Sequence, residues 1–195
     1  MALIFVGGVN GVGKTSISGI LSKKALVKTV HGTSELMKRL GVPIGDYAQF
    51  RMFPEEMKER AFEETLRSLA LRYTEDTLLV TGHYVKILEG KVTRSIGHWY
   101  KSCSALLSLT ADPESIFRRV FSDEKNGRRS ERKLFGQGMS SAEKVSLIER
   151  AQEESIGVMK LASRQFRVPC FCIENQDDRQ NQAVADIVKI LRGGK

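Results

Sequence analysis

The chain has 195 residues, of which 41% are hydrophobic and 28% are charged, and its formal net charge is +8 at pH 7. This composition is ordinary for a globular protein that is large enough to bury a core without disulfides or a metal ion. No apolar run is as long as a membrane span, and residues 1–6 lack the basic start of a signal peptide, so we expect a cytoplasmic protein with no membrane partner. The cysteines are odd in number, lack C-x-x-C spacing and are predicted to be small core residues: Cys103, Cys170 and Cys172.

A glycine-rich segment near the N-terminus, residues 8–15, fills the Walker A pattern G-x-x-x-x-G-K-[ST] completely. A run of buried-strand type, Leu3-Ile4-Phe5-Val6, precedes it, and residues 16–24 are typical of a helix. The glycines let successive backbone N–H groups point at a phosphate, and the helix adds the positive end of its dipole. Lys14 is expected to reach the β- and γ-phosphates of a nucleotide, and the Thr15 hydroxyl to bind Mg²⁺. The predicted nucleotide-binding residues of this loop are Gly8, Asn10, Gly11, Val12, Gly13, Lys14, Thr15 and Ser16.

Strand-like and helical segments alternate along the rest of the chain. This alternation predicts an α/β fold of three layers, with a five-stranded parallel sheet flanked by helices. A basic stretch over about 122–138 has no periodicity and is expected to form a small lid. After the first strand, the predicted strands are 27–30, 77–81, 106–110 and 170–173, and the later helices are 34–40, 54–73, 112 to about 121, 140–166 and 180–191.

Two helices carry specific signals. Ser140 with Glu143 forms a capping box, which predicts the start of the long helix that ends near residue 166. The helix that begins at Pro54 has helical apolar spacing, so four of its residues are predicted to face the core: Met57, Ala61, Leu66 and Leu69.

Polar and glycine residues follow each predicted strand. Because parallel sheets bind ligands outside the carboxyl ends of their strands, these segments are expected to meet at one rim. Beyond the Walker A loop, they contain Gly32 and Thr33, then Thr81, Gly82 and His83, then Thr110 and Asp112, and finally Asn175, Gln176 and Asp177.

Nearly the whole chain resembles the archaeal type of adenylate kinase and, more broadly, the nucleoside monophosphate kinases of the P-loop NTPase superfamily. The resemblance implies one P-loop kinase domain over residues 1–195, with an acceptor-binding segment at about 32–73 and a lid at about 122–138. The motifs that carry it, in order, are the Walker A loop, Gly32-Thr33, Arg51-Met52-Phe53-Pro54, His83, Arg118-Arg119, Arg128-Arg129, Arg150 and Ile173-Glu174-Asn175-Gln176-Asp177.

The resemblance also implies roles for these residues. It places Gly32, Thr33, Arg51 and His83 at the acceptor nucleotide. It places Arg119, Arg128, Arg129 and Arg150, with Lys14, around the transferring phosphoryl group, and Asn175, Gln176 and Asp177 near the donor base. Since phosphoryl transfer requires positioning and fixed positive charge, an arginine cluster of this kind suits the chemistry. The implied reaction uses ATP and Mg²⁺ and moves the γ-phosphoryl group to a nucleoside monophosphate, with AMP as the favoured acceptor.

One position departs from the family pattern. The family has an aspartate at the end of the third strand, where it orders Mg²⁺ or its water shell, and this chain has Thr81. Three alternatives therefore stay open: a kinase for another small metabolite, a kinase for a nucleic-acid end, and an ATPase or switch with no acceptor except water. The small number of aromatic residues disfavours nucleic acid as a partner.

Overall fold

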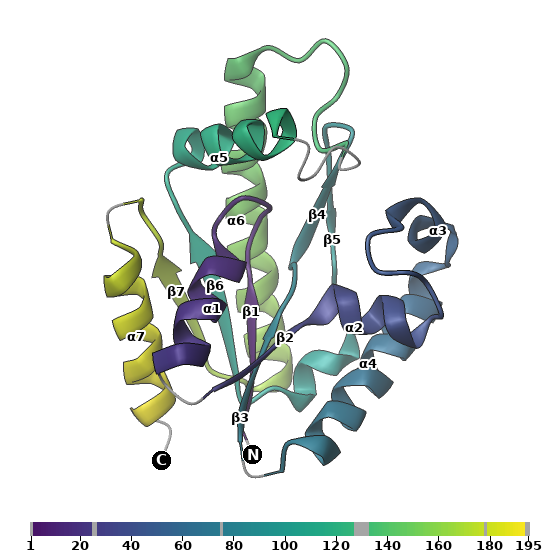
Figure 1. The fold of residues 1–195 in the computed structure, drawn as a ribbon, viewed down its shortest axis with the longest axis vertical. Coiled ribbons are helices and arrows are strands. Elements are labelled where there is room, and N and C mark those ends of the chain that lie inside the picture. The colour runs from purple at the N-terminus through teal and green to yellow at the C-terminus, as the bar shows by residue number, and fades with distance from the viewer. Residues whose placement is uncertain (1, 25–26, 75, 127–132, 178, 194–195) are drawn as a thin grey trace.

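The computed structural model of the chain describes residues 2–24, 27–74, 76–126, 133–177 and 179–193. Figure 1 shows their arrangement. The strands are β1 (Ala2–Gly7), β2 (Lys28–His31), β3 (Thr77–Thr81), β4 (Val85–Leu88), β5 (Lys91–Arg94), β6 (Ala105–Thr110) and β7 (Cys170–Glu174). The helices are α1 (Lys14–Lys24), α2 (Gly32–Arg39), α3 (Tyr47–Met52), α4 (Glu55–Arg72), α5 (Pro113–Lys125), α6 (Ser141–Phe166), α7 (Gln180–Gly193) and the short 3₁₀ helix η1 (His98–Ser102).

Five parallel strands form the central sheet in the order β2-β3-β1-β6-β7. In Figure 1, α1 and α7 lie in front of the sheet and α6 lies behind it. Because both faces are covered, the central strands are continuous apolar runs, and residues 3–6 of β1 are at most 4% exposed. Burial of each such side chain stabilises the fold by about 2 kcal/mol relative to exposure. The predicted three-layer α/β fold is confirmed.

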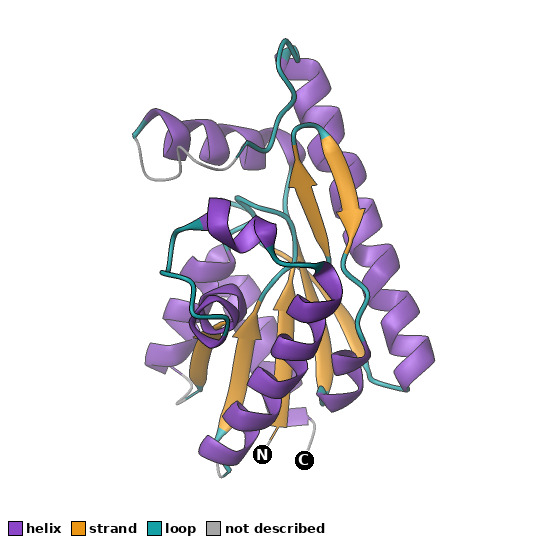
Figure 2. Ribbon diagram, turned by 90° about the vertical axis from the view of Figure 1, so that its right-hand side faces the viewer, coloured by secondary structure: helices purple, strands orange, loops and turns teal. Residues whose placement is uncertain are grey.

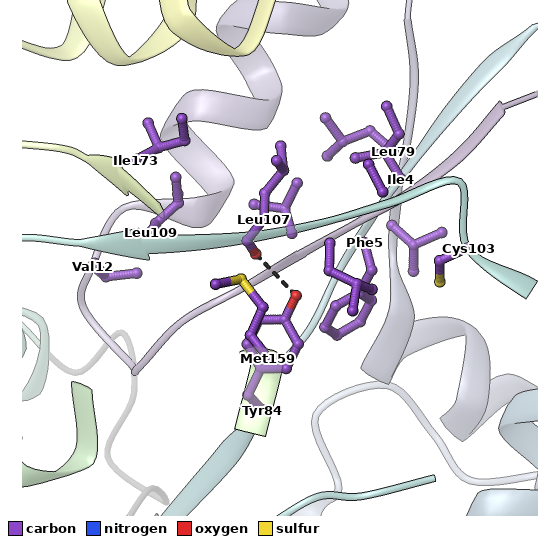
Figure 3. Packing of buried hydrophobic residues seen from close by; sticks show 14 of the residues in the cluster. Ile4, Phe5, Val12, Leu79, Tyr84, Cys103, Leu107, Leu109, Met159 and Ile173 are labelled. Atoms are coloured by element: carbon purple, nitrogen blue, oxygen red, sulfur yellow. Dashed lines mark hydrogen bonds between the residues drawn. The ribbon is translucent and has the colours of Figure 1, made fainter. Parts of the chain in front are cut away.

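Aromatic side chains fill the core behind the Walker A loop. The Phe5 ring lies 5.1 Å from the Tyr84 ring and 4.7 Å from the Trp99 ring, centroid to centroid. Figure 3 shows the Tyr84 hydroxyl pointing at β6, where it donates a hydrogen bond to the Leu107 carbonyl at 3.2 Å. Gly7 packs so closely on the Tyr84 ring that a Cβ there would lie 2.2 Å from it. The Tyr84 ring therefore packs directly against β1, the strand that leads into the Walker A loop.

A β-hairpin made of β4 and β5 was not predicted. It stands beside α6 and reaches toward the segment that follows α5 (Figure 2). At its tip, Glu89 and Gly90 have φ values of 50° and 80°. Their backbone N–H groups donate to the carbonyls of Lys133 and Leu134 at 2.6 and 2.9 Å. The hairpin thus connects the end of β3 to the chain that returns from the predicted lid.

Several local predictions are confirmed and others are wrong. The Ser140 capping box is present with both of its hydrogen bonds. The helix predicted to end near residue 121 is longer, because α5 continues to Lys125. Met57 is 48% exposed, whereas the neighbouring Lys58 is buried at 6%. The reason is that α4 turns Lys58 toward Glu55 and the ring of Phe50, which provide an ion pair and a cation–π contact.

The cysteine prediction holds for one residue of three. Cys103 is buried, and this burial raises the pKa of its thiol to about 12. Cys170 is half-buried and Cys172 is exposed, because β7 is an edge strand in which only Ile173 is buried. Among the described helices, none is long and apolar enough to cross a membrane.

Candidate nucleotide-binding site

The Walker A loop leaves β1 at Gly7 and enters α1 at Lys14. Three of its glycines have positive φ values: 138° at Gly8, 82° at Gly11 and 94° at Gly13. A Cβ at Gly8 would lie 2.7 Å from the Leu109 carbonyl oxygen, and one at Gly13 would lie 2.3 Å from Asn175 Nδ2. Glycine is therefore required both by the backbone conformation and by close neighbours. The loop ends at the N-terminus of an 11-residue helix, whose dipole favours a phosphate.

Lys14 is held inside this loop. Its ammonium group donates to the carbonyls of Gly8 and Val9, each at 2.8 Å. The side chains of Thr15 and Ser16 are exposed on the first turn of α1. This arrangement fits the phosphates of a nucleoside triphosphate, because the lysine, the helix N-terminus and the N–H groups of the glycine-rich loop all attract anionic oxygens.

The residues described give Mg²⁺ few ligands. Across the described ranges, no three His, Cys, Asp or Glu side chains lie close enough together to hold a metal ion. Mg²⁺ keeps several waters and takes much of its coordination from substrate phosphates. The donor set is therefore consistent with a metal ion that arrives with ATP.

Two histidines lie near the carboxyl ends of neighbouring strands: His31 is the last residue of β2, and His83 follows β3 by two residues. His83 Nδ1 lies 3.0 Å from the Gly8 carbonyl oxygen, so this nitrogen carries the donated proton. His31 Nδ1 lies 3.0 Å from the hydroxyl of Thr81, which stands where the resemblance to adenylate kinases predicts an aspartate. Thr81 is only 6% exposed. A hydroxyl and an imidazole thus occupy the place where the resemblance leads one to expect a carboxylate.

Arg119 lies on the other side of the loop, on α5. Its guanidinium donates to the Asp177 carboxylate, to the Gly11 carbonyl at 3.3 Å and to the Asn175 carbonyl at 3.3 Å. The hydrogen bond from Arg119 lowers the pKa of Asp177 and outweighs the opposing effect of partial burial. Arg118, also predicted to be near the site, is exposed and reaches Ser115 and Asp177. Arg119 therefore joins the loop to the segment after β7, on the side predicted for the donor base.

The segment after β7 is tied to its neighbours by all three predicted residues. Gln176 accepts a hydrogen bond from the Asp112 N–H at 3.3 Å. Asn175 is 0% exposed, and its Nδ2 donates to the Val12 carbonyl at 2.7 Å. The Asn175 side chain therefore contacts the Walker A loop itself and is shielded from solvent.

The predicted acceptor residues are less closely gathered. Gly32 is buried in the first turn of α2, where a Cβ would lie 2.9 Å from the Thr81 carbonyl oxygen, and Thr33 beside it is half-buried. Arg51 on α3 and Arg150 on α6 are exposed, and the charge of Arg150 helps to lower the pKa of Glu154 after the larger effect of Arg94. Arg128 and Arg129 lie outside the described residues. The structure thus brings Arg119 and residues 175–177 against the loop, and it leaves Arg51, predicted at the acceptor, and Arg150, predicted at the transferring phosphoryl group, at the surface.

A charged network between α4 and the β4–β5 hairpin was not predicted from the sequence. The Glu55 carboxylate accepts from Lys58 at 2.8 Å and from Lys86 of β4 at 2.7 Å. Burial opposes ionisation of Glu55, but the two lysines together lower its pKa. The network joins α4, and through the Phe50 ring also α3, to the hairpin. Glu55 and Lys58 have the spacing of an ordinary helical ion pair, which does not by itself indicate a network. The contact with Lys86, which depends on the folded structure, is what distinguishes this one.

Comparison with known proteins agrees with this geometry. The profile of the family described as "AAA domain" matches residues 4–145, which include the Walker A loop and the sheet up to β6. The chain belongs to this AAA domain family. The protein is therefore a P-loop kinase, and the predicted membership of the P-loop NTPase superfamily is confirmed. The more specific resemblance to adenylate kinases is not supported by these matches.

Relatives of this AAA domain protein are named as kinases. It is 30% identical to a shikimate kinase of Enterococcus faecalis (strain ATCC 700802 / V583) over an alignment of 129 residues. This alignment covers 66% of this chain and 70% of the relative. Among solved structures, shikimate kinase from Bacteroides thetaiotaomicron aligns with a TM-score of 0.60 at 14% identity, covering 98% of both chains. Shikimate kinase from Aquifex aeolicus aligns with a TM-score of 0.59 at 16% identity, covering 98% of this chain and 96% of the other. At these identities the structural matches establish the fold alone.

Proposed function

We propose that this P-loop kinase transfers the γ-phosphoryl group of ATP to a nucleoside monophosphate, with AMP as the favoured acceptor. The observation that carries this proposal is the absence of a carboxylate directly after β2 and β3. The residues there are Gly32, Thr33 and Ser34, and Gly82, His83 and Tyr84. The next acidic residue after β2, Glu35, is paired with Lys38 at 2.6 Å.

The lack of a carboxylate separates two kinds of acceptor. A hydroxyl acceptor must lose a proton as it attacks, and kinases commonly provide a carboxylate to accept that proton. A phosphate acceptor is already anionic at neutral pH and needs positive charge and correct placement instead. The site is rich in groups that hold phosphate and poor in groups that remove a proton. This chemistry favours a monophosphate.

The proposal gives the predicted residues their roles. Lys14, the loop backbone and the Thr15 hydroxyl would hold the ATP phosphates and Mg²⁺. The acceptor would be contacted by Gly32 and Thr33, at the N-terminus of α2, and by Arg51 and His83. Arg119 and Arg150 would surround the transferring phosphoryl group together with Lys14. Mg²⁺ supplies charge neutralisation between the phosphates. Arg128 and Arg129 keep their proposed place in the lid.

A second candidate is a small hydroxyl acceptor. The names of the relatives favour it, and one solved relative, shikimate kinase from Acinetobacter baumannii, is described in complex with shikimate. In this chain such an acceptor would have to give its proton to an imidazole, from His31 or His83.

One assay separates these candidates. ADP formation from ATP and Mg²⁺ is measured with AMP, CMP, UMP, GMP, the deoxynucleoside monophosphates, shikimate or no acceptor, and the Lys14→Ala variant serves as the inactive control. Dependence on one monophosphate supports the proposal. Dependence on shikimate establishes the second candidate, and equal ADP formation without an acceptor identifies an ATPase or switch.

A further inference from the structure

Asn175 is joined to the Walker A loop across 163 residues of sequence. Its Nδ2 donates to the Val12 carbonyl at 2.7 Å, its backbone N–H donates to Thr110 at 2.7 Å, and its carbonyl accepts from Arg119. The contact depends on a missing Cβ at Gly13, which would otherwise lie 2.3 Å from Nδ2. The side chain is thus inserted where the loop turns into α1.

One atom of the Asn175 side chain lowers the stability of the folded protein. Among the buried side-chain nitrogen and oxygen atoms of the described residues, Asn175 Oδ1 is the one without a hydrogen-bond partner. A buried acceptor left unpaired opposes folding. A side chain placed here for stability alone would satisfy both ends of its amide. The amide group is therefore better explained by what its Nδ2 does to the loop.

The hydrogen bond to Val12 fixes the orientation of one peptide unit. In a planar trans peptide, the carbonyl and the N–H point in opposite directions. By holding the Val12 carbonyl, Asn175 therefore also sets the direction of the Gly13 N–H. That N–H belongs to the run of backbone donors that a Walker A loop uses to bind phosphate.

We infer that Asn175 is a positioning residue for ATP, acting through the Val12–Gly13 peptide and not by touching the nucleotide base. This inference rests on the proposed function only for the binding of ATP, and the acceptor does not enter it. Loss of the Nδ2 donor lets the peptide rotate, so the loop must be reordered each time ATP binds. The result is weaker ATP binding with little change in stability, since the unpaired Oδ1 is removed as well.

The test compares two buried amides. Asn175→Ala is expected to weaken the Kd for ATP, measured by calorimetry, by about tenfold, the size of one hydrogen bond. The control is Gln152→Ala. Gln152 is also buried and makes two hydrogen bonds with Ala111, both at 2.9 Å, so its loss should lower Tm and leave the Kd for ATP within about twofold.

A spectroscopic measurement covers the case in which Asn175→Ala is unstable. Asn175→Asp keeps the shape, cannot donate and repels the Val12 carbonyl, so it should weaken ATP binding further. In either variant the Gly13 amide resonance should move, while the amides of Gly19 and Gly157, which have no neighbours within 4 Å of a Cβ position, should stay in place. A lower Tm with an unchanged Kd and an unmoved Gly13 resonance would overturn the inference. If no acceptor is phosphorylated but ATP still binds, the proposed function fails while this test stands.

Discussion

The imidazole of His31 and the hydroxyl of Thr81 lie side by side on neighbouring parallel strands, with 3.0 Å between Nδ1 and Oγ1. The two residues are directly paired in the register of β2 and β3. Restoring a carboxylate at this position should therefore create both a metal-ordering group and a partner for the imidazole.

Thr81→Asp is predicted to increase the apparent affinity for Mg²⁺, because the carboxylate restores negative charge beside the triphosphate. The measurement is a Mg²⁺ titration of ATP turnover. Thr81→Asn is the control, since it has the same shape without the charge and should leave the metal response unchanged. A variant with both weaker turnover and a weaker metal response would mean that the metal is organised elsewhere.

Lys14→Ala is predicted to reduce ATP turnover by at least about 10²-fold, because it removes a fixed charge from the transition state. Its effect on Tm should be small, since the lost hydrogen bonds to Gly8 and Val9 are on a half-buried loop. Lys23→Ala, in the last turn of the same helix, is the control and should retain full activity. Full turnover in Lys14→Ala would refute the assignment of the loop.

Glu55→Gln is predicted to destabilise the protein more than Lys58→Met. The first change leaves the buried Lys58 ammonium with a neutral partner, at a cost of about 1 kcal/mol, whereas the second removes the buried charge itself. Urea unfolding of both variants measures the difference, and Glu56→Gln on the same helix turn is the control. The explanation of the buried lysine fails if Lys58→Met is the less stable of the two.

Asp177→Asn is predicted to lower Tm slightly at pH 7 and not at all in acid. Arg119 holds the folded pKa of Asp177 below its ordinary value of 3.8. The ion pair therefore adds stability above that ordinary value and loses it as the pH falls through the folded pKa. Since the Asp177 side chain is 56% exposed, water and salt screen the pair and the effect is small.

Thermal unfolding of wild type and Asp177→Asn between pH 7 and pH 2 measures this effect. The difference in Tm should be constant near neutrality and disappear at the acid end. A difference that grows in acid would show that Asp177 does not stabilise the fold as a charged partner of Arg119.

The three inner strands of the central sheet, β3, β1 and β6, could be predicted from the sequence because they are buried on both faces. Such strands are continuous apolar runs, as at residues 77–81, and they are visible without any knowledge of their neighbours. The Walker A loop and the capping box at Ser140 are also local patterns, so each fixed its element by itself. The fold and the donor loop therefore followed from short segments.

The hairpin and the buried lysine could not be found in this way. A two-residue Glu89-Gly90 turn is a weak signal, because positive φ is uncommon for glutamate. Lys58 is buried only because Phe50 and Glu55 meet it in three dimensions. For Asn175, its place after a strand marked it as a site residue, but its contact with Val12 depends on the folded sheet.

The long separation between Asn175 and Val12 also bears on how the protein is made. During synthesis the Walker A residues leave the ribosome first, and β7 with Asn175 follows more than 160 residues later. Until that last strand pairs with β6, the Val12 carbonyl has no amide to hold it and the loop lacks its final shape. The nascent chain would thus carry the complete nucleotide-binding motif for most of its translation and gain tight ATP binding only as the sheet closes.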